Sequence, residues 1–403
     1  MSAIYIAGIA LCSVLAQWIA WGFRVPAILF LLLTGLLLGP ATGLLDPDAL
    51  LGDLLFPVVS LSVAVILFEG SLTLHFRELK GIGKVVRNLC SIGMITTCIV
   101  ISLSAYWILE LNWRVAAVLG AVLVVTGPTV IAPLLNSMRP TQDIDRILRW
   151  EGIVIDPIGA LFAVLVFEAV MLVGQGEVFI HTVIALFKTL GVGLSIGVVA
   201  GWLTTLLIRR EWLPFELHKF GILALVLISF TVSNHLSHES GLLAVTVFGI
   251  WLANQDDLEI DSVLEFKEDL SMILISTLFI LLAARLELAD LMMLDADVFI
   301  FLAIVLFIAR PLCIAISTFG TELPIKSRLV LAWIAPRGIV AAAVGSVFAI
   351  SMMEAGVADA EKMVPLIFTV IIITVVLQSL TAIPIAKLLG VRQPSPNTIL
   401  IIG

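Results

Sequence analysis

Two carboxylates lie in a long apolar stretch of the chain, and they are its clearest sign of chemistry. Glu151 and Asp156 open a run that stays apolar to about residue 173. An ionised aspartate near a bilayer centre costs roughly 2.5–3.5 kcal/mol, so such a residue usually serves a function. We therefore predict that Asp156 is an ion or proton site. The alternative is a carboxylate that is buried only to hold helices together.

The composition places these carboxylates in a membrane. Of the 403 residues, 61% are hydrophobic and 13% are charged, against about 25% charged in soluble proteins. This predicts an all-α polytopic membrane protein with no nucleic-acid footprint. At about 20 residues per crossing, the apolar segments sort into about 13 transmembrane helices. They are expected near residues 3–20, 26–40, 54–74, 88–109, 115–135, 150–173, 178–207, 219–236, 240–254, 268–285, 296–319, 328–350 and 363–388.

The basic residues predict the orientation, because translocation penalises Lys and Arg in short outside loops. If the N-terminus is outside, the loops on the cytoplasmic side carry sixteen Lys and Arg residues, and the opposite loops carry three. The N-terminus is therefore predicted to be outside and the C-terminus cytoplasmic. The three exceptions are Arg114, Arg285 and Lys362.

The fifth predicted helix carries a break, in the stretch TGPTVIAP. Pro128 lacks an N–H and frees the carbonyl of Val124, while Gly127 lets the chain bend. The break leaves the hydroxyls of Thr126 and Thr129 and unpaired carbonyls at membrane depth. Such backbone is tolerated where it lines a cavity or is buried in protein.

A second break occurs in the twelfth predicted helix, at Pro336, Arg337 and Gly338. The broken helices are seven apart, so one runs opposite to the other. This predicts an inverted repeat of six helices, with the seventh as linker. Paired interrupted helices in two inverted halves are typical of a transporter's midplane site. The alternative is two accidental kinks.

Other intramembrane charges need partners. Arg310 lies in the eleventh predicted helix. Glu151 and Asp156 are five residues apart, so they point about 140° apart around a helix and cannot easily share one partner. We predict a structural ion pair between Glu151 and Arg310, which leaves Asp156 for the substrate, and Arg337 where C-terminal half-helix dipoles converge. Glu69 is either an interfacial carboxylate or part of a cytoplasmic funnel.

The histidines and cysteines suggest no transition-metal site. The HLSH spacing at 235–238 has only two ligands, and the four cysteines lie inside apolar spans without a CxxC spacing. After residue 388 the composition changes. Residues 389–396 are predicted to be a linker, and 397–403 the first strand of a cytoplasmic Rossmann-like regulatory domain.

Five motifs together resemble one known family. They are LFEGSL, TGPTVIAPLL, RWEGIVIDPIGA, ARP and APRGIVAA, beginning at residues 67, 126, 149, 309 and 335. The combination is similar to monovalent cation/proton antiporters, in the CPA1 branch of bacterial sodium/proton antiporters and animal sodium/proton exchangers. The resemblance covers residues 1–388. It implies a thirteen-helix inverted-repeat fold, crossed broken helices, and a homodimer in which a core domain moves against a dimerisation domain.

The resemblance also implies roles for single residues. Asp156 is similar to the family's ion- and proton-carrying aspartate, and Thr126 to a residue that gives an oxygen to the ion. Glu151 and Arg310 match its stabilising ion pair, and Arg337 the arginine of its second broken helix. The chain departs from the family at two positions, where Ile155 replaces the usual asparagine and Gly127 an aspartate that many members carry.

These observations lead to a functional expectation. Asp156 would bind Na⁺, K⁺ or Li⁺, or a proton, but never both, giving electroneutral 1:1 exchange across a bacterial inner membrane for pH homeostasis. The tail resembles a nucleotide-sensing domain; within this chain itself no cofactor is expected. One alternative is a nucleotide-regulated monovalent cation channel. Another is a membrane-embedded enzyme, against which the divergence of the two carboxylates argues.

Overall fold

The computed structural model describes residues 2–23, 26–172, 178–237, 239–255, 261–285 and 295–393. Within these ranges the secondary structure is helical, and backbone pairing outside helices is limited to two isolated bridges. The all-α prediction is therefore confirmed. The predicted strand at 397–403 and His238 of the HLSH spacing lie outside the described residues.

Eight helical stretches of the described chain are long and apolar enough to cross a membrane. They contain α1 (Ser2–Phe23), α4 (Leu55–Ser71), α5 (Gly83–Asn88) with α6 (Met94–Ile108), α9 (Gln142–Met171), α10 (Val178–Arg209), α11 (His218–Leu236), α15 (Ala296–Ile304) with α16 (Arg310–Ser317), and α19 (Met363–Leu388). The number of thirteen crossings stays a prediction.

Other helices occupy the remaining predicted spans. They are α2 (Ala27–Leu36), α7 (Trp113–Val122), α8 (Pro128–Met138), α12 (Ser240–Ala253), α13 (Asp261–Ala284), α17 (Ile325–Trp333) and α18 (Ile339–Glu354). Four of them, α7, α8, α17 and α18, are the halves of the two broken helices. The interruptions lie between Val122 and Pro128 and between Trp333 and Ile339, where the sequence carries Pro and Gly residues.

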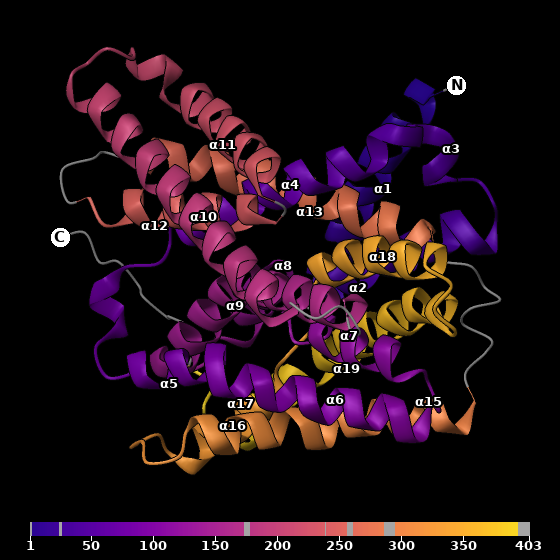
Figure 1. Ribbon diagram of the computed structural model, residues 1–403. Helices are drawn as coiled ribbons and strands as arrows, with labels where there is room; N and C mark the ends of the chain where they lie inside the picture. Colours follow the sequence, from indigo (N-terminus) through magenta and orange to yellow (C-terminus); the bar gives the residue numbers. More distant parts are fainter. Residues whose placement is uncertain are drawn as a thin grey trace.

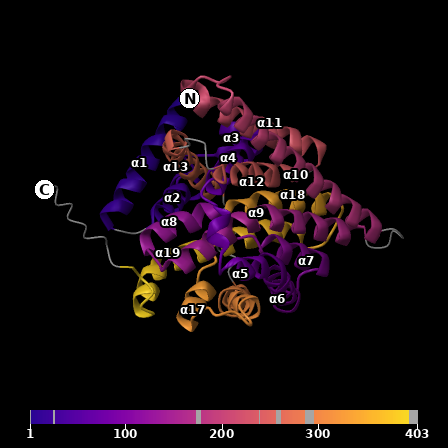
Figure 2. The same ribbon diagram turned by 90° about the vertical axis from the view of Figure 1, so that its left-hand side faces the viewer.

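The helices form two groups that meet along α4, α9 and α18. In both views α1, α4, α11 and α13 lie on one side, and α6, α17 and α19 lie on the other (Figures 1 and 2). We call the first group the scaffold. The second, which also holds α7, α8, α9, α16 and α18, is the core. Large apolar side chains on the outer helices are exposed, as expected for surfaces that face lipid. Examples are Trp18, Trp21, Phe187 and Trp202.

The fourth and eleventh predicted spans share an irregularity. Each contains a π-helical turn, at Leu89–Gly93 and at Val305–Ala309. The two spans run side by side (Figure 1), and a Cβ added at Gly93 would lie 2.5 Å from Ser317 Oγ. Matching π turns in these two spans support the predicted inverted repeat. The second turn ends just before Arg310 and so helps to set the position of that side chain.

The end of the described chain is tied to the core. Thr141 N donates to Val391 O at 2.9 Å, and Gln393 N donates to Arg139 O at 2.8 Å. These bonds flank an isolated bridge between Pro140 and Arg392. The segment after α19 is thereby held against the short connection between α8 and α9, the helices that carry the candidate site.

Candidate ion-binding site

The two broken helices cross at their interruptions. The chain is not helical between the end of α7 at Val122 and the start of α8 at Pro128, nor between α17 and α18. At the crossing, Thr126 and Arg337 form an isolated antiparallel bridge, and Gly127 N donates to Pro336 O at 3.1 Å. The crossed arrangement implied by the resemblance is therefore present.

Glycine at both breaks lets the two backbones touch. A Cβ added at Gly127 would lie 2.4 Å from the Cα of Gly338, and a Cβ at Gly338 would lie 2.4 Å from the Cα of Gly127. A contact this short with backbone cannot be relieved by rotating a side chain. The crossing therefore requires glycine at both positions.

Substituting alanine for Gly127 is expected to lower the free energy of unfolding by about 1–3 kcal/mol, because the added methyl group would separate the two breaks. Thermal denaturation in detergent measures the change. Gly191→Ala is the matched control, since Gly191 lies within α10 and nothing approaches its Cβ position within 4 Å. That control should be neutral or stabilising by up to about 1 kcal/mol. Equal stability of the two variants would contradict the close crossing.

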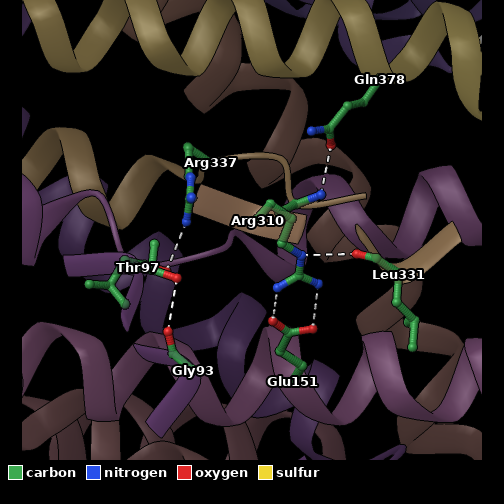
Figure 3. A network of polar contacts seen from close by, with 9 residues as sticks. Gly93, Thr97, Glu151, Arg310, Leu331, Arg337 and Gln378 are labelled. Atoms are coloured by element: carbon green, nitrogen blue, oxygen red, sulfur yellow. Dashed lines mark hydrogen bonds and ion pairs between the residues drawn. The ribbon is translucent and has the colours of Figure 1, made fainter. Parts of the chain in front are cut away.

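Arg310 links three elements of the core (Figure 3). Its Nη2 donates to Glu151 Oε2 at 2.8 Å, and its Nη1 pairs with Glu151 Oε1. Its Nε donates to the carbonyl oxygen of Leu331 at 2.9 Å, in the last turn of α17. Glu151 and Arg310 are 3% and 5% exposed, so the ion pair expected from the sequence is formed and buried. Its bidentate geometry is the strong form of such a pair.

Arg337 supports the other broken helix. Its Nη1 donates to the carbonyl oxygen of Val124 at 3.0 Å, the carbonyl that Pro128 was expected to free. Its Nε has no hydrogen-bond partner among the described residues. Arg337 thus lies beyond the C-terminus of α7, and Arg310 binds at the C-terminus of α17. Each cation faces the negative end of a half-helix dipole.

Two residues of α19 hold the second break and were missed by the sequence reasoning. Gln378 Oε1 accepts a hydrogen bond from Ala335 N at 3.0 Å, and Thr374 Oγ1 accepts one from Arg337 N at 3.3 Å. Both side chains are buried, and Gln378 reaches toward the break in Figure 3. The sequence did carry one signal for Gln378. Its amide side chain lies within the apolar run 363–388, and an amide at membrane depth needs a hydrogen-bond partner.

Asp156 faces the first break. Its side chain is 1% exposed, and its Oδ1 has no hydrogen-bond partner among the described residues. Gly152 and Gly159 lie four residues before it and three after it, on the same face of α9. Cβ positions at these glycines would lie 2.7 Å from side-chain atoms of Ile131 and Val125, respectively. The face that carries Asp156 therefore packs on the stretch from Val125 to Ile131.

That stretch contributes two more oxygens. Oγ1 of Thr126 and Oγ1 of Thr129 are buried and lack hydrogen-bond partners within the described chain. Thr126 was expected to give an oxygen to the ion, whereas Thr129 was expected only as part of the crossing. A carboxylate and hydroxyl oxygens are the hard ligands that alkali and alkaline-earth cations prefer. The same carboxylate can instead take a proton.

A cavity of about 410 Å³ leads to this region between the scaffold and the core. Pro128 and Thr129 line it at the crossing. Glu69 and Arg149 line it at the inner ends of α4 and α9, on the side predicted to be cytoplasmic. Glu69 is half-buried. Lining of this cavity is compatible with the funnel interpretation of Glu69, which stays a prediction.

Comparison with known proteins gives consistent matches. The family model described as sodium/hydrogen exchanger, transmembrane, matches residues 7–388. A K(+)/H(+) antiporter NhaP of Alkalimonas amylolytica is 25% identical over 390 residues, which cover 96% of this chain and 66% of the relative. Na(+)/H(+) antiporter 1 of Methanocaldococcus jannaschii is 25% identical over 374 residues, covering 88% of this chain and 85% of the relative.

The fold has a solved counterpart. The structure of the sodium proton antiporter MjNhaP1 from Methanocaldococcus jannaschii at pH 8 matches with a TM-score of 0.80 and 23% sequence identity. The match covers 97% of this chain and 100% of that chain. The antiporter fold that the resemblance implied is therefore confirmed, and the number of crossings stays a prediction.

Proposed function

Because the chain belongs to the sodium/hydrogen exchanger family, we propose that it is a secondary active antiporter that exchanges a monovalent cation for a proton. The observation that carries the proposal is Asp156, a buried carboxylate that faces a broken helix with two hydroxyls that have no hydrogen-bond partner in the described chain. The names of the relatives support it, since they are K(+)/H(+) and Na(+)/H(+) antiporters. The first of these is longer, and this chain spans 66% of its length.

Coupling follows from competition at one group. The carboxylate of Asp156 binds a cation, helped by Thr126 and Thr129, or it binds a proton. It does not hold both, so the two fluxes are coupled when the site changes sides only with a cation or a proton bound. Protons outcompete the cation at low pH, and few protons are available for exchange at high pH. The exchange rate therefore passes through a maximum as pH is varied.

The charge count favours electroneutral exchange. Glu151 is neutralised by its buried ion pair with Arg310. Position 127 holds glycine, where many family members carry a second aspartate. Among the described residues, Asp156 is then the carboxylate at the crossing that can bind either a cation or a proton. One cation replaces one proton, and the transport cycle moves no net charge.

Alternating access would come from movement of the core against the scaffold. Inverted repeats allow such a movement around a fixed midplane site. The cavity that reaches Pro128 and Thr129 from one side suits an inward-facing state. A homodimer, a bacterial inner membrane, an outside N-terminus and a nucleotide bound by a domain after residue 396 all remain proposals, which rest on the family resemblance and on the basic loops.

Purified protein in liposomes tests the function. An internal pH dye reports an imposed proton gradient while Na⁺, Li⁺ or K⁺ is added outside. An antiporter collapses the gradient only when a transported cation is present, and the responding ion identifies the substrate. The Na⁺ and Li⁺ series is repeated under a voltage imposed with K⁺ and valinomycin. An unchanged rate supports electroneutral exchange, whereas cation flux that needs no counter-ion and follows the voltage would establish a channel.

A further inference from the structure

A second cavity lies on the opposite side of the crossing. It measures about 130 Å³ and is lined by Phe56, Val59, Ser60 and Val63, in the first half of α4. The larger cavity is lined by residues from Ile66 onward in the same helix. The two cavities therefore lie toward opposite ends of α4, and the smaller one is on the side that the basic loops predict to be external.

The second cavity is also a gap between the scaffold and the core. Across from α4 it is lined by Val340, Ala343 and Val344, in the first turns of α18 after the crossing. The larger cavity is lined by the first turns of α8. Each cavity thus follows one half-helix away from the crossed breaks. This is the arrangement that two alternately open ion paths require.

One carboxylate lies among the apolar walls of the smaller cavity. Glu239 is its charged lining residue, and Ser60 and Asn234 are its other polar ones. Glu239 is half-buried and forms no ion pair or hydrogen bond with any described residue. Burial raises the pKa of its carboxyl group. A cation entering the cavity would supply the opposite charge that the described protein groups do not.

The turn that carries Glu239 is held in place. Glu239 has a φ of 60°, in the left-handed region, which costs of order 1–3 kcal/mol unless its surroundings impose it. Gly241 N donates to Asn234 Oδ1 at 2.7 Å, and Ser240 Oγ donates to Ser233 O at 2.7 Å. These bonds join the end of α11 to the start of α12. They fix the backbone from which the Glu239 side chain reaches the cavity.

From this geometry we propose that Glu239 is the group that receives the monovalent cation in an outer vestibule. The proposal rests on the antiporter function and adds a second cation contact to it, on the side opposite the large cavity. Glu239 attracts the hydrated cation into a cavity whose other walls are mostly apolar, and movement of α18 with the core then opens the way to Asp156. Its role is electrostatic, so a carboxylate is required and its exact length is not.

Membrane vesicles of known sidedness test this role. Right-side-out vesicles present the external face to added cation, and everted vesicles present the cytoplasmic face. Glu239→Gln is expected to raise the external KM for the cation by about fivefold to tenfold, as one lost charge contact implies. The cytoplasmic KM and the maximum rate should stay at their wild-type values. Glu239→Asp keeps the charge and should keep the external KM close to that of the wild type.

Glu354→Gln is the matched control, because Glu354 is exposed at the end of α18 on the same side and does not line the cavity. An unchanged external KM in Glu239→Gln would overturn the inference, and so would equal shifts on both faces or an equal shift in Glu354→Gln. In each of these cases wild-type exchange would leave the antiporter function intact. Absence of cation-dependent exchange in the wild type would overturn both proposals.

Discussion

Replacing Asp156 with asparagine is expected to reduce cation/proton exchange by at least about 100-fold, equivalent to more than about 2.7 kcal/mol. Asparagine has nearly the same shape but carries no charge for the cation and accepts no proton at neutral pH. Exchange therefore loses the group at which its two substrates compete. The measurement is the initial rate of gradient collapse in proteoliposomes, at equal amounts of reconstituted protein.

The same substitution should not destabilise the fold. Asp156 is buried and its Oδ1 lacks a partner among the residues that the structure describes, so removing its charge removes a desolvation cost. The melting temperature is expected to stay equal or to rise, which separates a lost site from a lost structure. Asp143→Asn, at an exposed position in the first turn of the same helix, should retain the wild-type rate. Exchange by Asp156→Asn at the wild-type rate would refute the assignment.

The second large effect is expected at the buried ion pair. Glu151→Gln should lower the free energy of unfolding by about 3–5 kcal/mol, because it leaves the Arg310 guanidinium buried without its counter-charge. Arg310 would retain its bond to the Leu331 carbonyl and could donate to the glutamine amide oxygen, but neither partner carries a negative charge. Thermal denaturation in detergent measures the loss of stability.

A double variant distinguishes the contribution of the ion pair from the cost of leaving one buried charge without its partner. Glu151→Leu with Arg310→Met removes both charges and is expected to recover much of the stability lost in Glu151→Gln. The exposed pair of Asp48 and Arg285, with an N–O distance of 3.1 Å, is the reference. Asp48→Asn should cost no more than about 1 kcal/mol. If Glu151→Gln and Asp48→Asn lowered the free energy of unfolding by the same small amount, the buried pair would have no special structural role.

Much of the candidate site was visible in the sequence. Asp156 and Glu151 stand out because an acidic residue in an apolar run is costly, and the breaks stand out because Pro and Gly interrupt helices. Even the carbonyl that Pro128 frees could be named in advance. The angle between Glu151 and Asp156 around their helix predicted that the two carboxylates have different partners. For Glu151 the predicted partner is confirmed, since it pairs with Arg310, 159 positions away.

Other parts of the site gave weak signals. Gln378 and Thr374 each accept from a backbone N–H of the second break, 43 and 37 residues away in sequence. Arg310 binds Leu331 O, a backbone group that any residue would offer. Glu239 lies between two helices, and in the sequence it cannot be distinguished from an ordinary acidic residue of a surface loop. Its place in a cavity depends on α4 and α18, which are distant in the chain.

The sequence by itself determined the helical membrane class, the two helix breaks and the charged residues that are costly to bury in a membrane. These properties are local, since hydropathy, the proline ring and the cost of burying a charge act within a few residues. Tertiary structure alone decided which partner each charge meets. Arg337, for example, donates to Val124 O across 213 residues. Such contacts depend on how the inverted halves pack, and that packing is the sum of many weak contacts along the whole chain.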